Sequence, residues 1–221
     1  MMLKNKHRHA FTMVEFLFVI IVIGILASLA LPRLDRDLRQ NAADNILSAI
    51  RYTQHLALTD NKTDPFDPNW QQKLWMIRFT GGANAYYTVS SDNDKSGSIT
   101  KTECAIDPIN GKYMYNSSGA FASIANDESP HIFLGHNYGI NSVTSSGSCA
   151  PRQHIAFDHL GRTFSGLKTT SGGTLAGNDY ATYLSGDCNI IFGFTDASID
   201  NIIITISAET GSAYIVGQPD S

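Results

Sequence analysis

The sequence predicts an α+β protein in which one long N-terminal α-helix, with a transmembrane half and an amphipathic half, packs on an antiparallel β-sheet head. Two observations support this fold class. An apolar run near the N-terminus passes into a stretch with a helical period, and from residue 61 onward short apolar segments alternate with Gly, Asn, Ser and Asp clusters. The chain has 221 residues, of which 43% are hydrophobic and 16% charged, the balance of a folded domain and not of a disordered chain.

The N-terminal segment combines a basic flank with a long apolar run. Residues 1–10 contain no acidic residue, and the run from Phe16 to Leu31 is apolar except for one Gly and one Ser. With the residues just before it, this run reaches about 20 residues, enough for a helix to cross the ~30 Å core of a bilayer. The basic flank predicts a cytoplasmic N-terminus and an exported remainder. A secretory signal peptide is the alternative, but its apolar region is usually shorter, and here the helical pattern continues past Pro32.

Residues 33–60 form the predicted amphipathic half of the same helix. Apolar residues recur there every three or four positions, as on one face of a soluble helix. They are Leu34, Leu38, Ala42, Ile46, Leu47, Ile50 and Ala57. Pro32 removes one backbone donor, so we expect a kink at this position without an end to the helix. The helix is predicted to end at about Thr59.

Glu15 is the one acidic residue beside the apolar run. A carboxylate costs roughly 2.5–3.5 kcal/mol at the centre of a membrane helix, so it calls for a cationic partner or a function. Cleavage after Ala10 would supply a cation, because it exposes a free amino group on Phe11. An amine from a neighbouring copy can pair with Glu15 in a low-dielectric bundle and thereby fix the register between subunits.

These N-terminal residues resemble a known processing signal. The segment Ala10-Phe11-Thr12-Met13-Val14-Glu15, together with the basic leader and the apolar run, is similar to the class III signal of type IV prepilins and type II secretion pseudopilins. The resemblance implies cleavage before Phe11 by prepilin peptidase, N-methylation of the new amine, and docking of each subunit through Glu15. The family usually has Gly where this chain has Ala10, which predicts slower processing.

The same resemblance implies a domain organisation, a location and partners. Residues 1–10 would be the leader peptide, 11–32 the transmembrane and polymerisation helix, 33–60 its amphipathic half, and 61–221 a β-rich periplasmic head. The protein would be a single-pass inner-membrane protein before it enters a filament. Its partners would be other pilins or pseudopilins, the prepilin peptidase and an inner-membrane assembly platform.

The head is predicted to consist of short antiparallel strands. Their predicted ranges are 73–79, 85–89, 112–115, 131–134, 154–158, 189–194, 202–207 and 213–216. Turns are expected at 158–161 and 208–211, where Asp, Glu, Thr and Gly gather.

Two segments of the head resemble the GspH/FimT group of minor pseudopilins. Ile155 to Arg162 is similar to the strand and turn pattern I-x-F-x-x-x-G-R of that group, and Ile202 to Gly211 is similar to its closing strand and turn. The resemblance implies a minor subunit near a filament tip. Some members bind DNA through a basic C-terminal region, but the last 20 residues of this chain contain no Lys or Arg, and the chain has a net charge of −4. We therefore expect no nucleic-acid partner.

Residues 92–103 fit the spacing of a 12-residue EF-hand calcium loop. Gly97 falls at the sharp turn and Ile99 at the apolar position. The expected oxygen ligands are Asp92, Asp94, Ser96, the Ser98 carbonyl, Thr100 and Glu103. No amphipathic helices flank the loop, and the alternative is a solvated turn. We expect a structural Ca²⁺ site with the affinity typical of extracellular modules.

The chain contains three cysteines, Cys104, Cys149 and Cys188. None belongs to a CxxC or a Cys/His cluster with zinc-ligand spacing, so we expect no zinc site. In an exported head one disulfide and one odd thiol are expected. Three pairings are open, and Cys149–Cys188 is preferred because both residues lie at the ends of predicted strands that can be neighbours.

The sequence favours a structural role over catalysis. His131, His136, His154 and His159 accompany no metalloprotease, hydrolase, P-loop or dinucleotide motif. Trp70, Trp75, Tyr86 and Tyr87 are expected to pack in the core of the head, and a surface for a carbohydrate or a partner protein is the alternative. Three hypotheses remain: a structural pseudopilin of a type II secretion system, which we favour; a minor pilin of a type IV pilus serving adhesion, motility or DNA uptake; and an anchored module that does not polymerise.

Overall fold

The computed structural model describes residues 13–167 and 182–218, with the backbone alone between residues 27 and 37. Two compact units divide the chain, Met1–Leu38 and Arg39–Ser221. Helix α1 (Met13–Thr59) spans 47 residues and continues through Pro32 without a break in its helical backbone. The predicted N-terminal helix is therefore confirmed, and it ends at the expected residue.

Within the first unit, α1 presents apolar side chains to the outside. Every side chain from residue 13 to residue 26 is exposed, including Phe16 and Phe18, which keep 63% and 67% of their surface. The described part of the chain includes no helix with both the length and the apolar character that a membrane crossing requires.

Within the second unit, α1 changes to an amphipathic pattern. Ala42, Ile46 and Ile50 are fully buried, whereas Asp44 and Ser48 on the other side of the helix are exposed. The buried positions are spaced by four residues, so they lie on one face of the helix. This face contributes to the main hydrophobic core of the second unit.

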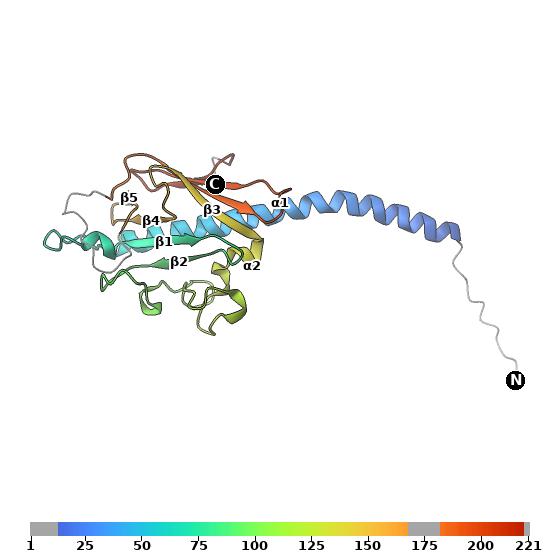
Figure 1. Cartoon of the computed structure of the whole chain (residues 1–221). Coiled ribbons are helices and arrows are strands. Elements are labelled where there is room, and N and C mark those ends of the chain that lie inside the picture. Colours follow the sequence, from blue (N-terminus) through green and yellow to red (C-terminus); the bar gives the residue numbers. More distant parts are fainter. Residues whose placement is uncertain (1–12, 168–181, 219–221) are drawn as a thin grey trace, which may run out of the picture. The chain divides into compact units, whose positions relative to one another are not determined.

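The strands of the described residues form two antiparallel four-stranded sheets (Figure 1). Their bounds are β1 (Trp75–Thr80), β2 (Tyr86–Ser90), β3 (Ile140–Gly147), β4 (His154–Phe157), β5 (Thr163–Phe164), β6 (Cys188–Phe194), β7 (Ile202–Ile206) and β8 (Ala213–Ile215). The first sheet has the order β2-β1-β4-β5 and the second the order β3-β6-β7-β8. The predicted turns at 158–161 and 208–211 connect β4 to β5 and β7 to β8.

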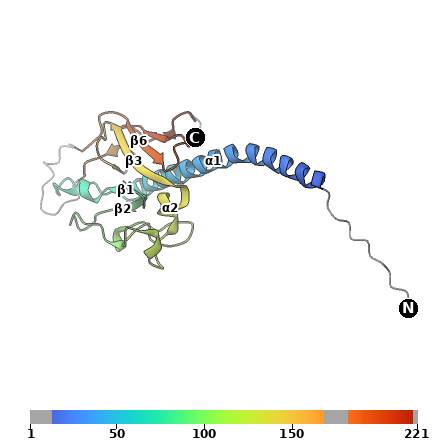
Figure 2. The same cartoon turned by 45° about the vertical axis from the view of Figure 1, so that its right-hand side comes forward.

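One hydrophobic core joins the helix to both sheets. Ile77 of β1, Phe192 of β6 and Ile204 of β7 have no exposed surface and belong to the same cluster as Ile46 and Ile50 of α1. In both views the part of α1 in this unit runs along the strands (Figures 1 and 2). The first sheet is buried on its other face as well, because Trp70, Phe164 and four further buried side chains form a second, smaller cluster there.

Three predictions about the head need correction. The head has two sheets where one was expected. The predicted strand at 131–134 is wrong, because Ser129 accepts a hydrogen bond from the His131 backbone N–H (3.2 Å), Pro130 starts a 3-10 turn, and helix α2 (Leu134–Tyr138) follows. The range 112–115 forms no regular strand, since Tyr113 makes only single bridges to its neighbours.

Two strands were not expected from the sequence. β3 contains a run of Asn, Ser and Thr and buries only Ile140 and Val143, because it lies at the edge of the second sheet and faces solvent along most of its length. β5 is two residues long, too short for any alternating pattern to develop.

Candidate functional site

The N-terminal segment carries the predicted processing and assembly residues. Glu15 lies in the first turn of α1 and is exposed among exposed apolar side chains. A carboxylate in the first turn of a helix is favourable to the helix macrodipole. Ala10 and Phe11, the predicted cleavage site, lie outside the described residues, and so does the side chain of Pro32.

The predicted calcium loop brings three carboxylates together. It follows β2 and ends in a 3-10 turn at Lys101–Glu103, and the bridge between Ser90 and Cys104 closes its base. One carboxylate oxygen from each of Asp92, Asp94 and Glu103 lies within 4.8 Å of the others. Asp92 keeps only 2% of its surface exposed. Residues that are 11 positions apart in the sequence thus meet in one cluster.

The backbone of the loop holds these carboxylates in place. Asp92 accepts backbone N–H bonds from Ser96 (3.1 Å, at Oδ1) and Gly97 (2.9 Å, at Oδ2). Gly97 has a φ of +76°, a conformation that glycine adopts without strain, as the predicted sharp turn requires. Glu103 accepts N–H bonds from Asn93 (3.0 Å) and Thr100 (2.9 Å). The loop is thus wrapped around its own acidic side chains.

The other three predicted ligands belong to the same network. The Ser96 hydroxyl donates to the Ser98 carbonyl oxygen (3.0 Å), and the Thr100 hydroxyl donates to Oε2 of Glu103 (2.8 Å). All the candidate metal ligands are oxygen atoms. Ca²⁺ and Mg²⁺ prefer oxygen ligands, whereas zinc does not. The donor set therefore fits a hard divalent cation.

The electrostatics of the loop also favour a cation. Burial of Asp92, together with the nearby carboxylates of Asp94 and Glu103, raises the pKa of Asp92 above its ordinary value, although N–H bonds from Gly97 and Ser96 act in the opposite direction. Hydrogen bonds from Ser96 lower the pKa of the exposed Asp94. A divalent ion would replace the repulsion among these carboxylates by attraction.

An ion-pair cluster that the sequence did not predict connects the loop at 92–103 to the segment between α1 and β1. Asp67 pairs with Lys95 of the loop (2.9 Å) and with Lys73 (3.0 Å). The hydrogen bond from Lys95, together with that from Lys73, lowers the pKa of Asp67 to about 2. Lys62 also donates to the Oδ1 atom of Asn93 (3.0 Å). The partners are up to 31 positions apart, so no local pattern could have indicated them.

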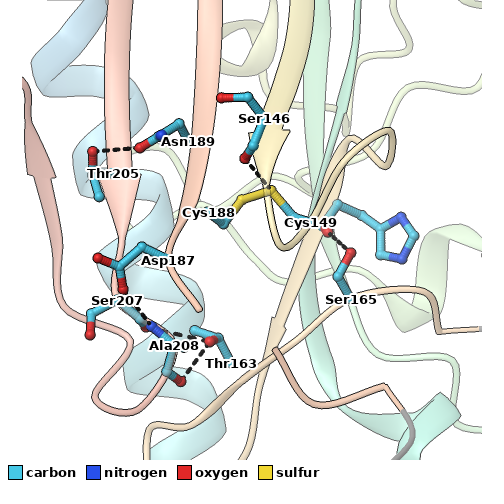
Figure 3. The surroundings of a disulfide bond; sticks show 11 residues. Ser146, Cys149, Thr163, Ser165, Asp187, Cys188, Asn189, Thr205, Ser207 and Ala208 are labelled. Atoms are coloured by element: carbon cyan, nitrogen blue, oxygen red, sulfur yellow. Dashed lines mark hydrogen bonds between the residues drawn. A yellow bond between two sulfur atoms is a disulfide. The ribbon is translucent and has the colours of Figure 1, made fainter. Parts of the chain in front are cut away.

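A disulfide joins Cys149 and Cys188, the pair preferred from the sequence. It connects the loop after β3 to the first residue of β6, and these strands are paired with Gly147 opposite Cys188 (Figure 3). Gly147 has a φ of +79°, and a Cβ there would lie 2.4 Å from the Asp187 carbonyl oxygen, so a side chain is excluded. The disulfide therefore clamps one end of the tightly paired strands β3 and β6.

The third cysteine is a buried thiol. Cys104 follows the calcium loop, and its burial raises its pKa to about 12, with the Glu103 and Glu128 carboxylates adding to the effect. A thiol that stays protonated at neutral pH is a poor nucleophile. Cys104 is thus a packing residue.

His131 and His154 occupy structural positions in the second unit. The ring of His131 lies 2.9 Å from Oδ2 of the buried Asp107, and the Ser129 hydroxyl donates to that same carboxylate instead of to the histidine. Burial, with Arg78 and Arg152 nearby, lowers the pKa of His154 to about 4, and His154 accepts the Gly166 N–H (3.0 Å). These contacts join His131 to a carboxylate and His154 to a backbone N–H, whereas the His159 ring lies 3.3 Å from the Thr63 hydroxyl.

The comparisons with known proteins concern the N-terminus. The family model of the prokaryotic N-terminal methylation motif matches residues 5–31. Among curated proteins and solved structures, nothing matches this chain. The motif supports a type IV pilin-like protein that prepilin peptidase processes and that assembles with other pilins, a structural subunit and not an enzyme. Because the match ends before the head, the resemblance to the GspH/FimT group stays a prediction.

Proposed function

We propose that this protein is a minor structural subunit of a type II secretion pseudopilus. The observation that carries the proposal is Glu15, an acidic side chain within the methylation motif and on the apolar, exposed first part of α1. A surface of this kind is unstable in water and requires lipid or other subunits around it. A polymerising subunit is surrounded by lipid before assembly and by other subunits afterwards.

Residues 11–32 anchor the subunit in the inner membrane before assembly. Their sequence is almost wholly apolar and follows a basic flank, so the N-terminus stays in the cytoplasm and the head is exported to the periplasm. The disulfide of the head supports this location, because disulfides persist in oxidising compartments.

Assembly follows from cleavage after Ala10. The new amino group of Phe11 is a cation at the end of an apolar helix, and Glu15 of the adjacent subunit is the matching anion. Their pairing in a low-dielectric bundle selects one axial register, because a subunit in any other register leaves a buried charge without its partner. N-methylation keeps the amine cationic.

We also propose that the loop at 92–103 binds a structural Ca²⁺ ion. Asp92, Asp94 and Glu103 supply carboxylate oxygens, and Ser96, Ser98 and Thr100 supply the remaining oxygens that a coordination number of six or more requires. The three clustered carboxylates and the all-oxygen surroundings support this proposal. The ion would fix a loop that is held by hydrogen bonds and has little apolar packing.

Replacement of Glu15 by Ala tests the assembly proposal. We expect E15A to reach the membrane and to be cleaved, but to enter filaments at least about tenfold less than the wild type, because the register-setting pair is lost. Cross-linking and shear-fraction immunoblots measure incorporation, and secretion assays measure function. The control is V14A, which truncates the adjacent exposed apolar side chain (77% exposed) and retains the carboxylate.

The outcomes separate the hypotheses. Normal incorporation of E15A would exclude assembly through this residue. A loss of twitching, adhesion or DNA uptake with normal protein secretion would assign the subunit to a type IV pilus, whereas a loss of secretion alone would support the pseudopilus.

A further inference from the structure

A polar pocket of about 460 Å³ lies in the second unit, where the chain leaves α1. Residues 60–64 line it together with Lys73 and Asn93. Its volume falls in the range of about 300–1,000 Å³ that is typical of sites for small organic ligands. Carboxylate, amide, hydroxyl and ammonium groups surround the pocket, and the composition is therefore suited to a ligand with many hydrogen-bonding groups.

The two lysines that line the pocket are already paired. Lys62 lies 2.8 Å from Asp60 and donates to the Asn93 side chain at 3.0 Å. Lys73 lies 3.0 Å from Asp67. An anionic ligand would have to displace a carboxylate from each lysine, so the pocket is poorly suited to phosphate or to acidic peptides. A neutral ligand meets donors and acceptors on the same wall.

The polar groups are held in position before any ligand binds. Asn61 accepts the Thr63 N–H at 2.9 Å, and Asp64 accepts the Phe66 N–H at 3.0 Å. The Trp75 indole donates to Asp60 at 2.8 Å. Side chains that are already ordered lose little conformational entropy on binding, which favours even a ligand that makes few contacts.

An exposed aromatic ring follows the segment that lines the pocket. Phe66 follows Asp64 by two residues and keeps 96% of its surface exposed. The Asp64 hydrogen bond on one side and the Asp67 ion pairs on the other fix the backbone that carries this ring. A rigid loop thus carries an apolar ring close in sequence to the polar groups of the pocket.

We propose that this pocket binds a neutral carbohydrate. A sugar has both polar and apolar surfaces. Each of its hydroxyls donates and accepts hydrogen bonds, as the polar groups of the pocket require, and the C–H face of its ring packs on aromatic side chains. Asp64, Asn61 and Asn93 would bind the hydroxyls, and Phe66 would contact the apolar face. This activity is separate from assembly through the N-terminal helix and does not depend on it.

The test uses the full chain in a zwitterionic detergent without a sugar headgroup. A glycan array that contains neutral and acidic oligosaccharides is followed by saturation-transfer NMR with the methyl glycosides of glucose, galactose, mannose, N-acetylglucosamine and N-acetylgalactosamine. Glucose 1-phosphate and sialic acid serve as the acidic probes. We expect at least one neutral probe to bind with a dissociation constant of about 1 mM or lower, and no preference for the acidic ones.

Three variants identify the site. F66A removes an exposed ring and should weaken binding about tenfold without a change in thermal stability. D64N retains the acceptor for the Phe66 N–H and removes one carboxylate oxygen, so it should weaken binding several-fold. The control I109A truncates another exposed apolar side chain (76% exposed) that lines a different pocket, and it should bind as the wild type does. Absence of binding to every neutral probe, preference for the acidic probes, or full binding by F66A would overturn the proposal.

Discussion

Replacement of Asp92 by Asn is the sharpest test of the calcium loop. Asp92 is the most buried of the three clustered carboxylates, with 2% of its surface exposed. The change preserves the size of the side chain, removes one negative charge and leaves a single acceptor oxygen for the N–H groups of Ser96 and Gly97. The lost hydrogen bond costs about 1 kcal/mol, and relief of repulsion from Asp94 and Glu103 offsets this cost. Without metal, D92N and the wild type should therefore have similar stability.

The effect of calcium can be calculated for the wild type. Extracellular calcium modules have dissociation constants of about 10⁻⁴–10⁻³ M. An ion at ~5 mM that binds only the folded state then adds about 1–2.3 kcal/mol of stability. For a chain of this size, the corresponding rise in Tm is about 2–9 °C. Because D92N loses a ligand at the first position of the loop, its rise should fall to less than about a third of the wild-type value.

The assay is thermal unfolding of the full chain in detergent, followed by circular dichroism in EGTA and in ~5 mM CaCl₂. The matched control is D196N, because Asp196 also caps a turn through Oδ1, by accepting the Ser198 N–H, and lies outside the loop. It should respond to calcium as the wild type does. No calcium-dependent rise in the wild type, or an equal rise in D92N, would refute the site.

The pH dependence gives an independent check. Because the pKa of Asp92 is raised in the fold, the metal-free folded chain binds this proton more tightly than the unfolded chain. Its stability therefore falls as the pH rises from about 3.9, the ordinary pKa of Asp, through the raised value. Calcium competes with the same proton, so the calcium-dependent gain in Tm should be smaller at about pH 4 than at about pH 7. An equal gain at both pH values would contradict binding at Asp92.

Three further changes have defined outcomes. A10G should be cleaved by prepilin peptidase at least as fast as the wild type in a gel-shift time course, since the family usually has Gly at this position; slower cleavage would contradict the assignment of the site. Joint replacement of Cys149 and Cys188 by Ala removes a cross-link that closes a separation of 39 residues, and should cost about 4 kcal/mol in denaturant unfolding. I50A, at a fully buried position of α1, should cost about 2–5 kcal/mol, whereas S48A on the exposed side should stay within about 0.5 kcal/mol; similar losses for the two variants would refute the packing of this helix face.

The sequence predicted those features that depend on neighbouring residues. Helix α1 was predicted to its last residue, because a long apolar run passes directly into a stretch, from Leu34 to Ala57, in which apolar residues recur with a helical period. Six of the eight predicted strands are present, since each is a short apolar segment between clusters of Gly, Asn, Ser and Asp. The calcium loop folds around the expected carboxylates because its 12 residues carry their own turn, at Gly97.

Only the tertiary structure decided the features that join distant segments. The division into two sheets, the edge strand β3 and the ion pairs of Asp67 arise from contacts between residues that no local pattern connects. The range 131–134 shows the reason: four residues are compatible with a strand or a helix, and the flanking Pro130 and Gly139 decide in favour of turns and α2. The polar pocket lined by residues 60–64 has the same origin, because its wall forms only when Lys73 and Asn93 meet the segment that follows α1. The periodicity of apolar residues is a local property of the chain. The pairing of strands and the formation of a pocket depend instead on which distant segments bury their surfaces against each other and exclude water.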